Sequence, residues 1–271
     1  MSTKKAWFVT GASKGLGLTL VKKLLAEGYS VAATSRNISE LQKVISEENS
    51  TFLPLEVDLV NENSVSEAVS KSIEKFGKLD VIVNNAGYGQ LGTLEELTDE
   101  ESRKNFDINV FGSLNIIRKT MPYLRAQKSG FIINIASIGG LTGEFAGWGV
   151  YCATKFAVVG CTEALAAEVK EFGMNATVVY PGYFRTDFLT GGSLRTPKNK
   201  INAYTTARQL QVAHEKDING NQPGDPEKGA LALIELAEME NPPVHLVLGS
   251  DAFEIAGNKL EALKNEILTY K

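Results

Sequence analysis

Seven short apolar runs, separated by longer segments of helical periodicity, constrain this chain more than any other feature of its sequence. The runs are bounded by turn residues and are almost continuously apolar, as expected for strands buried on both faces of a parallel sheet. Strands that alternate with helices predict a doubly wound α/β sheet with right-handed crossovers. We therefore predict one α/β domain over residues 1–271, with about seven parallel strands at 6–10, 29–34, 51–57, 79–83, 132–137, 175–180 and 244–248.

Composition and charge argue against several classes of protein. A net charge of −4 and a pI near 5.5 give no indication of a nucleic-acid partner. No apolar run approaches the length that spans a bilayer, and Lys4 and Lys5 precede a glycine turn rather than a signal-peptide core. Cys152 and Cys161 fit neither a disulfide framework nor a zinc site. We expect a cytoplasmic protein without a metal centre or a membrane contact.

A glycine-rich turn, Gly11-Ala-Ser-Lys-Gly15-Leu-Gly17, joins the first predicted strand to the first helical segment. Glycines let the backbone approach a phosphate, and a helix N-terminus supplies free N–H groups and a positive dipole end. The spacing differs from the G-x-G-x-x-G of dinucleotide folds, and a glycine turn can be simple loop geometry. The strand–turn–helix context nevertheless predicts a dinucleotide site that includes Gly11, Ser13, Lys14, Gly15, Leu16 and Gly17.

The second strand ends at Ser35 and Arg36, where an acidic residue would bind the ribose 2′-hydroxyl of NAD. Arginine at this position suits the 2′-phosphate of NADP, and Lys14 adds a second positive charge. A hydrogen bond to a charged group contributes about 1.5–3 kcal/mol, which favours NADPH by roughly tenfold or more. The alternative interpretation of Arg36 is an exposed loop charge.

Polar or glycine residues also follow the later strands: Asp58 and Leu59, Asn84 to Gly87, Ser137, and Pro181-Gly182. The carboxyl ends of parallel strands meet at the sheet edge where ligands bind, which predicts that these residues share one site. Asp58 could contact an adenine ring or cap the helix predicted at 61–76. Asn109, inside a helix predicted at 100–127, could face solvent, mark a kink, or hold a water or a backbone carbonyl.

Tyr151 and Lys155 are four residues apart at the start of a helical segment, so both side chains lie on one helix face. A phenol with a pKa of about 10 exchanges protons poorly at neutral pH, and a neighbouring ammonium favours its ionised form. Ser137 could bind the same substrate oxygen. A Tyr-x-x-x-Lys pair alone occurs by chance in many helices, so its significance depends on the surrounding site.

Residues 183–222 have weak periodicity, and we predict that they form a substrate lid. Its apolar residues suit a pocket but could equally pack the lid onto the body: Phe184, Phe188, Leu189, Leu194 and Tyr204.

Taken together, these motifs resemble the short-chain dehydrogenase/reductase family over nearly the whole chain. The resemblance rests on Thr10–Gly17, Asn84-Asn85-Ala86-Gly87, Asn109, Ser137, Tyr151-x-x-x-Lys155 and Pro181-Gly182-x-x-x-Thr186. One departure is visible, because Ser137 and Tyr151 are fourteen residues apart where thirteen is expected. The intervening loop therefore carries one extra residue, which affects substrate fit more than chemistry.

The resemblance implies a single-domain Rossmann fold and an NADP(H)-dependent oxidoreductase that interconverts a carbonyl and an alcohol. It implies Asn109, Ser137, Tyr151 and Lys155 as catalytic residues, with Tyr151 as the general acid and base. It implies cofactor contacts from Ser35, Arg36, Asp58, Leu59, Asn85, Ala86, Gly87, Tyr151, Lys155, Pro181, Gly182, Phe184 and Thr186, in addition to the glycine turn.

The resemblance also implies a small-molecule substrate and a homodimer or homotetramer. The lid and the turn at 224–228 resemble those of retinol and hydroxysteroid dehydrogenases. Two alternatives stay open at this point. One is an NADP(H)-binding sensor or scaffold without turnover, and the other is an epimerase or dehydratase that uses a bound cofactor.

Overall fold

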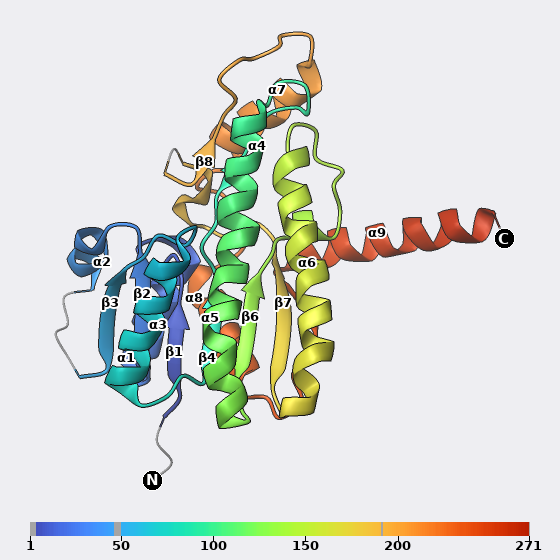
Figure 1. Ribbon diagram of the computed structural model, residues 1–271. Coiled ribbons are helices and arrows are strands. Elements are labelled where there is room, and N and C mark those ends of the chain that lie inside the picture. Colours follow the sequence, from blue (N-terminus) through green and yellow to red (C-terminus); the bar gives the residue numbers. More distant parts are fainter. Residues whose placement is uncertain (1–3, 46–49, 191, 271) are drawn as a thin grey trace.

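The computed structural model describes residues 4–45, 50–190 and 192–270, and these form a seven-stranded parallel sheet covered by helices on both faces (Figure 1). The strand order is β3-β2-β1-β4-β6-β7-β9, which confirms the predicted doubly wound α/β fold. The strands are β1 (Ala6–Val9), β2 (Ser30–Ser35), β3 (Phe52–Glu56), β4 (Val81–Asn84), β6 (Phe131–Ile135), β7 (Asn175–Pro181) and β9 (His245–Leu248).

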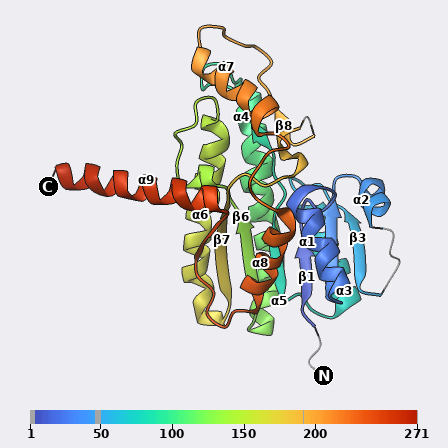
Figure 2. The same cartoon turned by 180° about the vertical axis from the view of Figure 1, so that it is seen from behind.

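Helices on the two faces explain why the strands are almost continuously apolar. Trp7 and Val9 of β1 pack toward α1 (Gly15–Ala26) and α8 (Pro226–Glu238), which lie in front of the sheet in Figure 2. Phe8 points the other way, into a cluster with α3 (Glu62–Phe76), α5 (Gly112–Gln127) and α6 (Gly149–Val169). Because successive side chains of a strand alternate between faces, both sets of positions must be apolar.

A buried row of polar side chains fixes the register at the centre of the sheet. Asn84 and Asn134 are opposite each other on β4 and β6, and Asn84 Nδ2 donates to Asn134 Oδ1 at 2.8 Å. Asn134 Nδ2 in turn donates to Thr162 Oγ1 on α6 at 2.9 Å. A slip of one residue would leave these buried amides unpaired, so the carboxyl ends of β4 and β6 are held level.

The helix predicted at 100–127 is continuous but contains a π-helical turn. It consists of α4 (Asp99–Phe106), the π turn Asp107–Phe111 and α5, and it begins with a capping box between Thr98 and Glu101. Asn109 lies in the π turn and is only 1% exposed, so the interpretation that it faces solvent is wrong.

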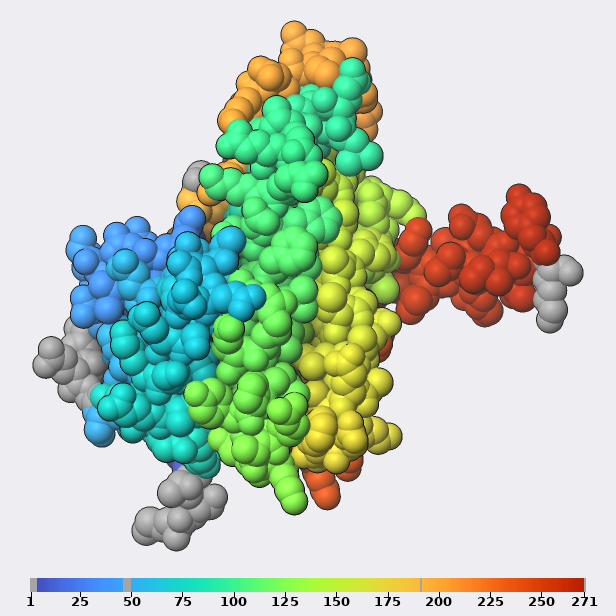
Figure 3. All heavy atoms as spheres, viewed as in Figure 1, coloured from blue at the N-terminus to red at the C-terminus, as the bar shows by residue number. Residues whose placement is uncertain are grey.

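Two helix boundaries differ from the predicted ones. The apolar spacing of residues 41–48 predicts a helix there, but helix α2 spans Ile38–Val44, because the Asn37 side chain accepts from Ser39 N at 2.9 Å and starts the helix earlier. Residues 46–48 of that prediction lie outside the described residues. Apolar spacing also predicts a helix at 252–268, and the observed helix is α9 (Ser250–Thr269), which leaves the body of the protein after its first turns (Figure 3).

The segment predicted as a lid, residues 183–222, is built from short elements that attach it to the body. Strand β8 (Leu194–Arg195) pairs in parallel with β5 (Gly89–Gln90), and the helix α7 (Thr205–Val212) leads into a second π turn at Ala213–Ile218. The segment also contains a short 3-10 turn at Asp187–Leu189, and two more such turns lie elsewhere in the chain, at Ile138–Gly140 and Lys170–Phe172. Because no single period runs through this segment, its sequence gives a weak helical signal.

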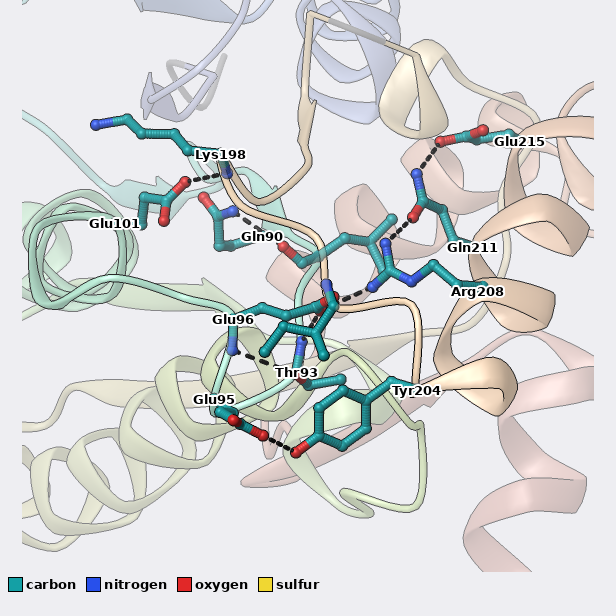
Figure 4. A network of polar contacts seen from close by, with 12 residues as sticks. Gln90, Thr93, Glu95, Glu96, Glu101, Lys198, Tyr204, Arg208, Gln211 and Glu215 are labelled. Carbon is teal, nitrogen blue, oxygen red and sulfur yellow. Dashed lines mark hydrogen bonds and ion pairs between the residues drawn. The ribbon is translucent and has the colours of Figure 1, made fainter.

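A buried carboxylate anchors the lid segment (Figure 4). The side chain of Glu96 is fully buried and accepts from Thr93 N at 2.8 Å, from Ile201 N at 2.7 Å and from Arg208 Nη2 at 2.8 Å. Nearby, Glu101 accepts from Lys198 N at 3.0 Å. The lid segment is therefore held at its strand β8 and again at its helix α7.

One helix of the described chain, Gly149–Phe172, is long and apolar enough to cross a membrane by length and composition alone. The expectation that no apolar run reaches this length therefore fails for this helix. It packs against β7, and Leu165 and Val169 are buried in the core, as in the central helix of a globular domain.

Candidate active site

A cavity of about 550 Å³ opens along the carboxyl edge of the sheet. Its lining comes from the segments that follow β1, β2, β3, β4, β6 and β7, together with the start of α6 and the lid segment. β1 lies between β2 and β4 at the point where the strand order reverses, and ligands of open α/β sheets bind at such a point. Of the predicted site residues, all line this cavity except Gly17, Asn84 and Asn109. Asn84 lies within β4 and pairs with Asn134 instead.

The glycine turn forms a cradle that side chains would fill. Gly11 and Gly15 have φ angles of +64° and +58°, and a Cβ on Gly11 would lie 2.8 Å from Ala86 Cα. A Cβ on Gly17 would lie 2.4 Å from Asn85 Nδ2 and 2.6 Å from the Gly11 carbonyl oxygen. Gly17 therefore supports the turn from behind, where its missing side chain permits close packing. Helix α1 begins here without a side-chain cap, which suits an anion such as a pyrophosphate.

Positive charges gather at the end of the cavity next to β2. Lys14 and Arg36 both line it, and Lys14 Nζ donates to the Gly192 carbonyl oxygen of the lid segment at 2.6 Å. Burial lowers the pKa of Lys14, and the repulsion between its charge and that of Arg36 lowers it further. An anion bound between the two cations would relieve this repulsion. Glu40 also lines this end, which the sequence analysis missed.

Asp58 lines the same cavity and does not cap α3. Its Oδ1 accepts from Val60 N at 3.1 Å, whereas Asn61 caps α3 by accepting from Asn63 N and Ser64 N. The capping interpretation of Asp58 is therefore wrong, and its carboxylate faces the ligand edge of the sheet.

The predicted Ser137, Tyr151 and Lys155 meet at the opposite end of the cavity. Ser137 follows β6 and accepts from Gly139 N at 3.1 Å through its Oγ, which fixes the hydroxyl in place. Tyr151 and Lys155 are 7% and 5% exposed on the same face of α6. Lys155 Nζ donates to the Ile135 carbonyl oxygen at 2.9 Å and lies 5.7 Å from the centre of the Tyr151 ring.

Burial shifts the pKa of both catalytic candidates. It raises the pKa of Tyr151 above the ordinary range of a phenol, and a hydrogen bond with Ser137 offsets only part of this rise. Burial also lowers the pKa of Lys155 to about 8. The prediction that Lys155 lowers the pKa of Tyr151 is therefore not met in the protein without ligands. Burial disfavours both the tyrosinate and the charged lysine, and so it moves the two pKa values the other way.

Asn109 lies behind the cavity wall and holds the backbone. Its Oδ1 accepts from Tyr88 N at 3.0 Å, and its Nδ2 donates to Tyr88 O at 3.1 Å and to Thr154 Oγ1 at 3.0 Å. Of the roles considered for it, holding a backbone carbonyl is the one that the structure shows. Through Tyr88, Asn109 fixes the chain that runs from Gly87 into the cavity wall.

Aromatic residues that the sequence analysis did not select surround Tyr151. Trp148 packs edge-on against Tyr151 with 5.3 Å between ring centres, and its ring lies 5.1 Å from that of His214. Tyr183 Oη lies 2.9 Å from His214 Nε2. The position of Tyr183 after Pro181-Gly182 could have indicated a role, but no sequence signal marks His214, because it reaches the cavity only through the fold of the lid segment.

Comparison with known proteins agrees with this geometry. Residues 5–194 match the family model described as short chain dehydrogenase. The chain belongs to the short-chain dehydrogenase family. It is 34% identical to the oxidoreductase BOA17 of Botryotinia fuckeliana over 96% of this chain and 94% of that protein. It is 37% identical to a 3-ketodihydrosphingosine reductase of Bacteroides thetaiotaomicron over 89% of this chain and 86% of that protein.

Solved structures of the family share the fold. A short-chain dehydrogenase from Streptomyces avermitilis superposes with a TM-score of 0.88 and 33% identity, covering 98% of this chain and 97% of that one. ElxO with bound NADP has a TM-score of 0.76 with 27% identity over 93% and 99% of the two chains. A 3-ketoacyl-(acyl-carrier-protein) reductase from Brucella melitensis with NADH has a TM-score of 0.75 with 26% identity over 91% and 97%. A nicotinamide cofactor is thus supported, whereas the resemblance to retinol and hydroxysteroid dehydrogenases stays a prediction.

Proposed function

We propose that this oxidoreductase interconverts a ketone or aldehyde and an alcohol, with NADP(H) as its preferred cofactor. The observation that carries the proposal is the meeting of Ser137, Tyr151 and Lys155 in the same cavity as the glycine cradle and Arg36. One end of the cavity thus offers proton chemistry, and the other offers a binding site for a phosphorylated nucleotide.

The residues that line the cavity suit the parts of a dinucleotide. The cradle at Gly11 and Gly15 would hold the pyrophosphate, and Arg36 with Lys14 would bind a 2′-phosphate. Asp58 would contact the adenine ring. The cofactor-binding set that we propose is completed by Ser13, Leu16, Ser35, Leu59, Asn85, Ala86, Gly87, Pro181, Gly182, Phe184 and Thr186, with Gly17 behind the cradle.

When bound, the reduced cofactor supplies the hydride, and the chain supplies the proton. Tyr151 donates its phenolic proton to the carbonyl oxygen of the substrate, and its raised pKa keeps the proton in place until that oxygen becomes basic. Ser137 donates a second hydrogen bond to the same oxygen and stabilises its developing charge. Lys155 at neutral pH is mostly protonated and stabilises the tyrosinate that remains.

Two alternatives are distinguishable from this proposal. A sensor or scaffold would bind the cofactor without turnover, although it would not need Ser137, Tyr151 and Lys155 together. An epimerase or dehydratase would copurify with nucleotide and consume no NADPH. The small-molecule substrate, the homodimer or homotetramer and the cytoplasmic location predicted from sequence are parts of the same proposal.

The decisive experiment follows NADPH absorbance with a panel of ketones, aldehydes, quinones and steroids, with NADH in parallel. We expect turnover that is faster with NADPH, and a loss of about a hundredfold or more in Tyr151→Phe, because this variant removes the proton donor. Binding of NADPH without turnover of any compound would favour the sensor. Wild-type turnover in Tyr151→Phe would refute the role of Tyr151.

A further inference from the structure

A second tyrosine in the cavity has a hydrogen-bonding role opposite to that of Tyr151. Tyr183 lines the cavity, and its hydroxyl lies 2.9 Å from Nε2 of His214, a residue of the π turn in the lid segment. The other ring nitrogen, Nδ1, lies 2.7 Å from the Leu210 carbonyl oxygen. A carbonyl oxygen only accepts, so Nδ1 carries the hydrogen, and in the neutral ring Nε2 is an acceptor.

The hydroxyl of Tyr183 therefore donates its only hydrogen to His214. Burial raises the pKa of Tyr183 to about 12, and the charge of Asp251 contributes, so the phenol stays protonated at neutral pH. With its hydrogen committed, the hydroxyl oxygen can offer only lone pairs to a ligand. Tyr151 and Ser137, in contrast, offer hydrogens to the substrate carbonyl.

The position of Tyr183 is set by rings that connect it to the catalytic tyrosine. His214 contacts Trp148, and Trp148 contacts Tyr151, with ring centres 5.1 and 5.3 Å apart. Tyr183 is also near enough for its charge state to affect the pKa of Tyr151. The acceptor thus lies in the substrate end of the cavity, whose remaining lining includes Phe145, Phe188 and Leu189.

We propose that the Tyr183–His214 pair selects carbonyl substrates that carry an O–H or N–H donor near the carbonyl, on an otherwise apolar skeleton. This inference rests on the proposed reductase function and names its substrate class. A substrate without the donor would leave the lone pairs of Tyr183 without a partner in a confined site, which weakens its binding.

The test compares 2-hydroxyacetophenone with 2-methoxyacetophenone and acetophenone as substrates with NADPH. The first two compounds carry oxygen at the same position, so they are similar in carbonyl reactivity, but only the hydroxyl donates. We expect kcat/KM of the wild type to favour the hydroxy compound over the methoxy compound by about three- to tenfold. In Tyr183→Phe and in His214→Phe this ratio should fall to about one, in the latter because Tyr183 regains its hydrogen for donation.

Tyr180→Phe is a matched control. Tyr180 forms a similar pair with His245, at 2.9 Å from Nδ1, but neither residue lines the cavity, so the ratio should keep its wild-type value. Equal kcat/KM for the hydroxy and methoxy compounds in the wild type would overturn the inference while the reductase function stands. A wild type inert toward all three ketones would also overturn it, whereas the wider panel above decides whether the chain is a reductase.

An independent inference concerns α9, which projects from the body (Figure 1). Ala252 and Ala256 at its start are buried against Ile138, and Lys259 forms an ion pair with Glu144 at 2.6 Å. The rest of this helix leaves the body (Figure 3). The projecting part, residues 260–269, is shorter than the roughly 12–15 residues that a free helix needs in water, so a packing partner would stabilise it.

The apolar residues of α9 form a coiled-coil seam. They recur at alternating intervals of three and four, as the a and d positions of heptads do, at Phe253, Ala256, Leu260, Leu263, Ile267 and Tyr270. Phe253 is 75% exposed, Leu260 57% and Ile267 65%, so within the described chain only Ala256 of the seam is buried, where it packs against Ile138. A seam confined to a and d positions fits another helix rather than a flat surface.

Charges beside the seam favour a second copy in antiparallel orientation. Lys259, which also contacts Glu144 of its own chain, and Glu266 occupy the same heptad position one repeat apart. An antiparallel pair places each lysine next to the glutamate of the other copy. A parallel pair in register would instead place Lys259 next to Lys264 of the other copy. In the antiparallel pair, Leu260 packs on Leu263 of the second copy, and the two bodies lie at opposite ends of a helix about 30 Å long.

We propose that α9 pairs with α9 of a second copy of this chain. Light scattering after size exclusion should show a smaller assembly for Leu260→Glu and Ile267→Glu than for the wild type. Leu268→Glu is the control, because Leu268 is 54% exposed but lies outside the seam, and it should keep the wild-type mass. If both seam variants have the same mass as the wild type, the proposal is overturned. A wild type that is itself a monomer would overturn it as well.

Discussion

Glu96→Gln should release the lid segment without unfolding the protein. In the wild type, Glu96 Oε2 accepts from both Thr93 N and Arg208 Nη2, and Oε1 accepts from Ile201 N. An amide offers one acceptor oxygen in place of two, so its NH₂ group must face one or two of these donors. Losing a charge-assisted bond and leaving a buried donor unpaired costs about 3 kcal/mol, which is roughly a hundredfold in a local opening equilibrium.

Hydrogen exchange measures this opening directly. The amides of α7 should exchange about a hundredfold faster in Glu96→Gln, whereas the amides of β4 and β6 should exchange at the wild-type rate, because the core does not contain Glu96. Glu100→Gln is the control, since Glu100 and Lys198 join the same two segments by an ion pair that is 72% and 61% exposed. An α7 exchange rate within about threefold of the wild type, or equal acceleration in the sheet, would refute the anchor.

The same carboxylate gives the anchor a pH dependence. Burial raises the pKa of Glu96, but the backbone N–H groups of Thr93 and Ile201, with Arg208, lower it by more, so the net shift is downward. A lowered folded-state pKa stabilises the lid above the unfolded value of about 4.3, and this contribution is lost as the pH falls through the folded value. The exchange rate of α7 amides, divided by the rate of an unstructured peptide at the same pH, should therefore rise in the wild type as the pH falls through the lowered pKa of Glu96, and it should depend less on pH in Glu96→Gln.

Three further predictions follow from the cavity. Gly17→Ala should weaken NADPH binding by at least about tenfold, measured by fluorescence titration, because its Cβ would lie 2.4 Å from Asn85 Nδ2 and shift the turn. The pKa of Lys155 is about 8, so Lys155 loses its proton as the pH rises through that value, and kcat/KM for reduction should fall there. A profile that stays flat to about pH 10 would show that the charge of Lys155 does not assist proton transfer from Tyr151. Arg36→Leu should raise the dissociation constant of NADPH by roughly tenfold or more and leave that of NADH nearly unchanged, and equal effects on the two would show that Arg36 does not bind the 2′-phosphate.

Local periodicity and turn chemistry were enough to predict the sheet and the edge where the cavity lies. Strand spacing placed Ser137 and Pro181-Gly182 correctly, because the carboxyl ends of parallel strands must lie together. The start of α2 was missed because Asn37, a capping residue, outweighs the apolar periodicity that begins at Leu41.

The substrate end of the cavity was not predictable in the same way. His214 reaches Tyr183 only because β8 pairs with β5, residues more than a hundred positions apart, and such a two-residue pairing has no sequence signal. The role of Asn109 was ambiguous for a related reason, because a π turn cannot be distinguished from an α-helix by apolar spacing alone.

That π turn determines how this region tolerates insertions and deletions. A π turn contains one residue more than the α-helical turn it replaces, so deleting one residue between 107 and 111 would restore a regular helix. The restored helix would rotate α4 by about 100° relative to α5. Asn105 and Asn109 both donate to Tyr88 O at 3.1 Å, and after that rotation they could no longer do so together. Among related sequences, gaps should therefore be frequent in the loop between Ser137 and Tyr151 and absent from 107–111, although that stretch is helical and contains no glycine.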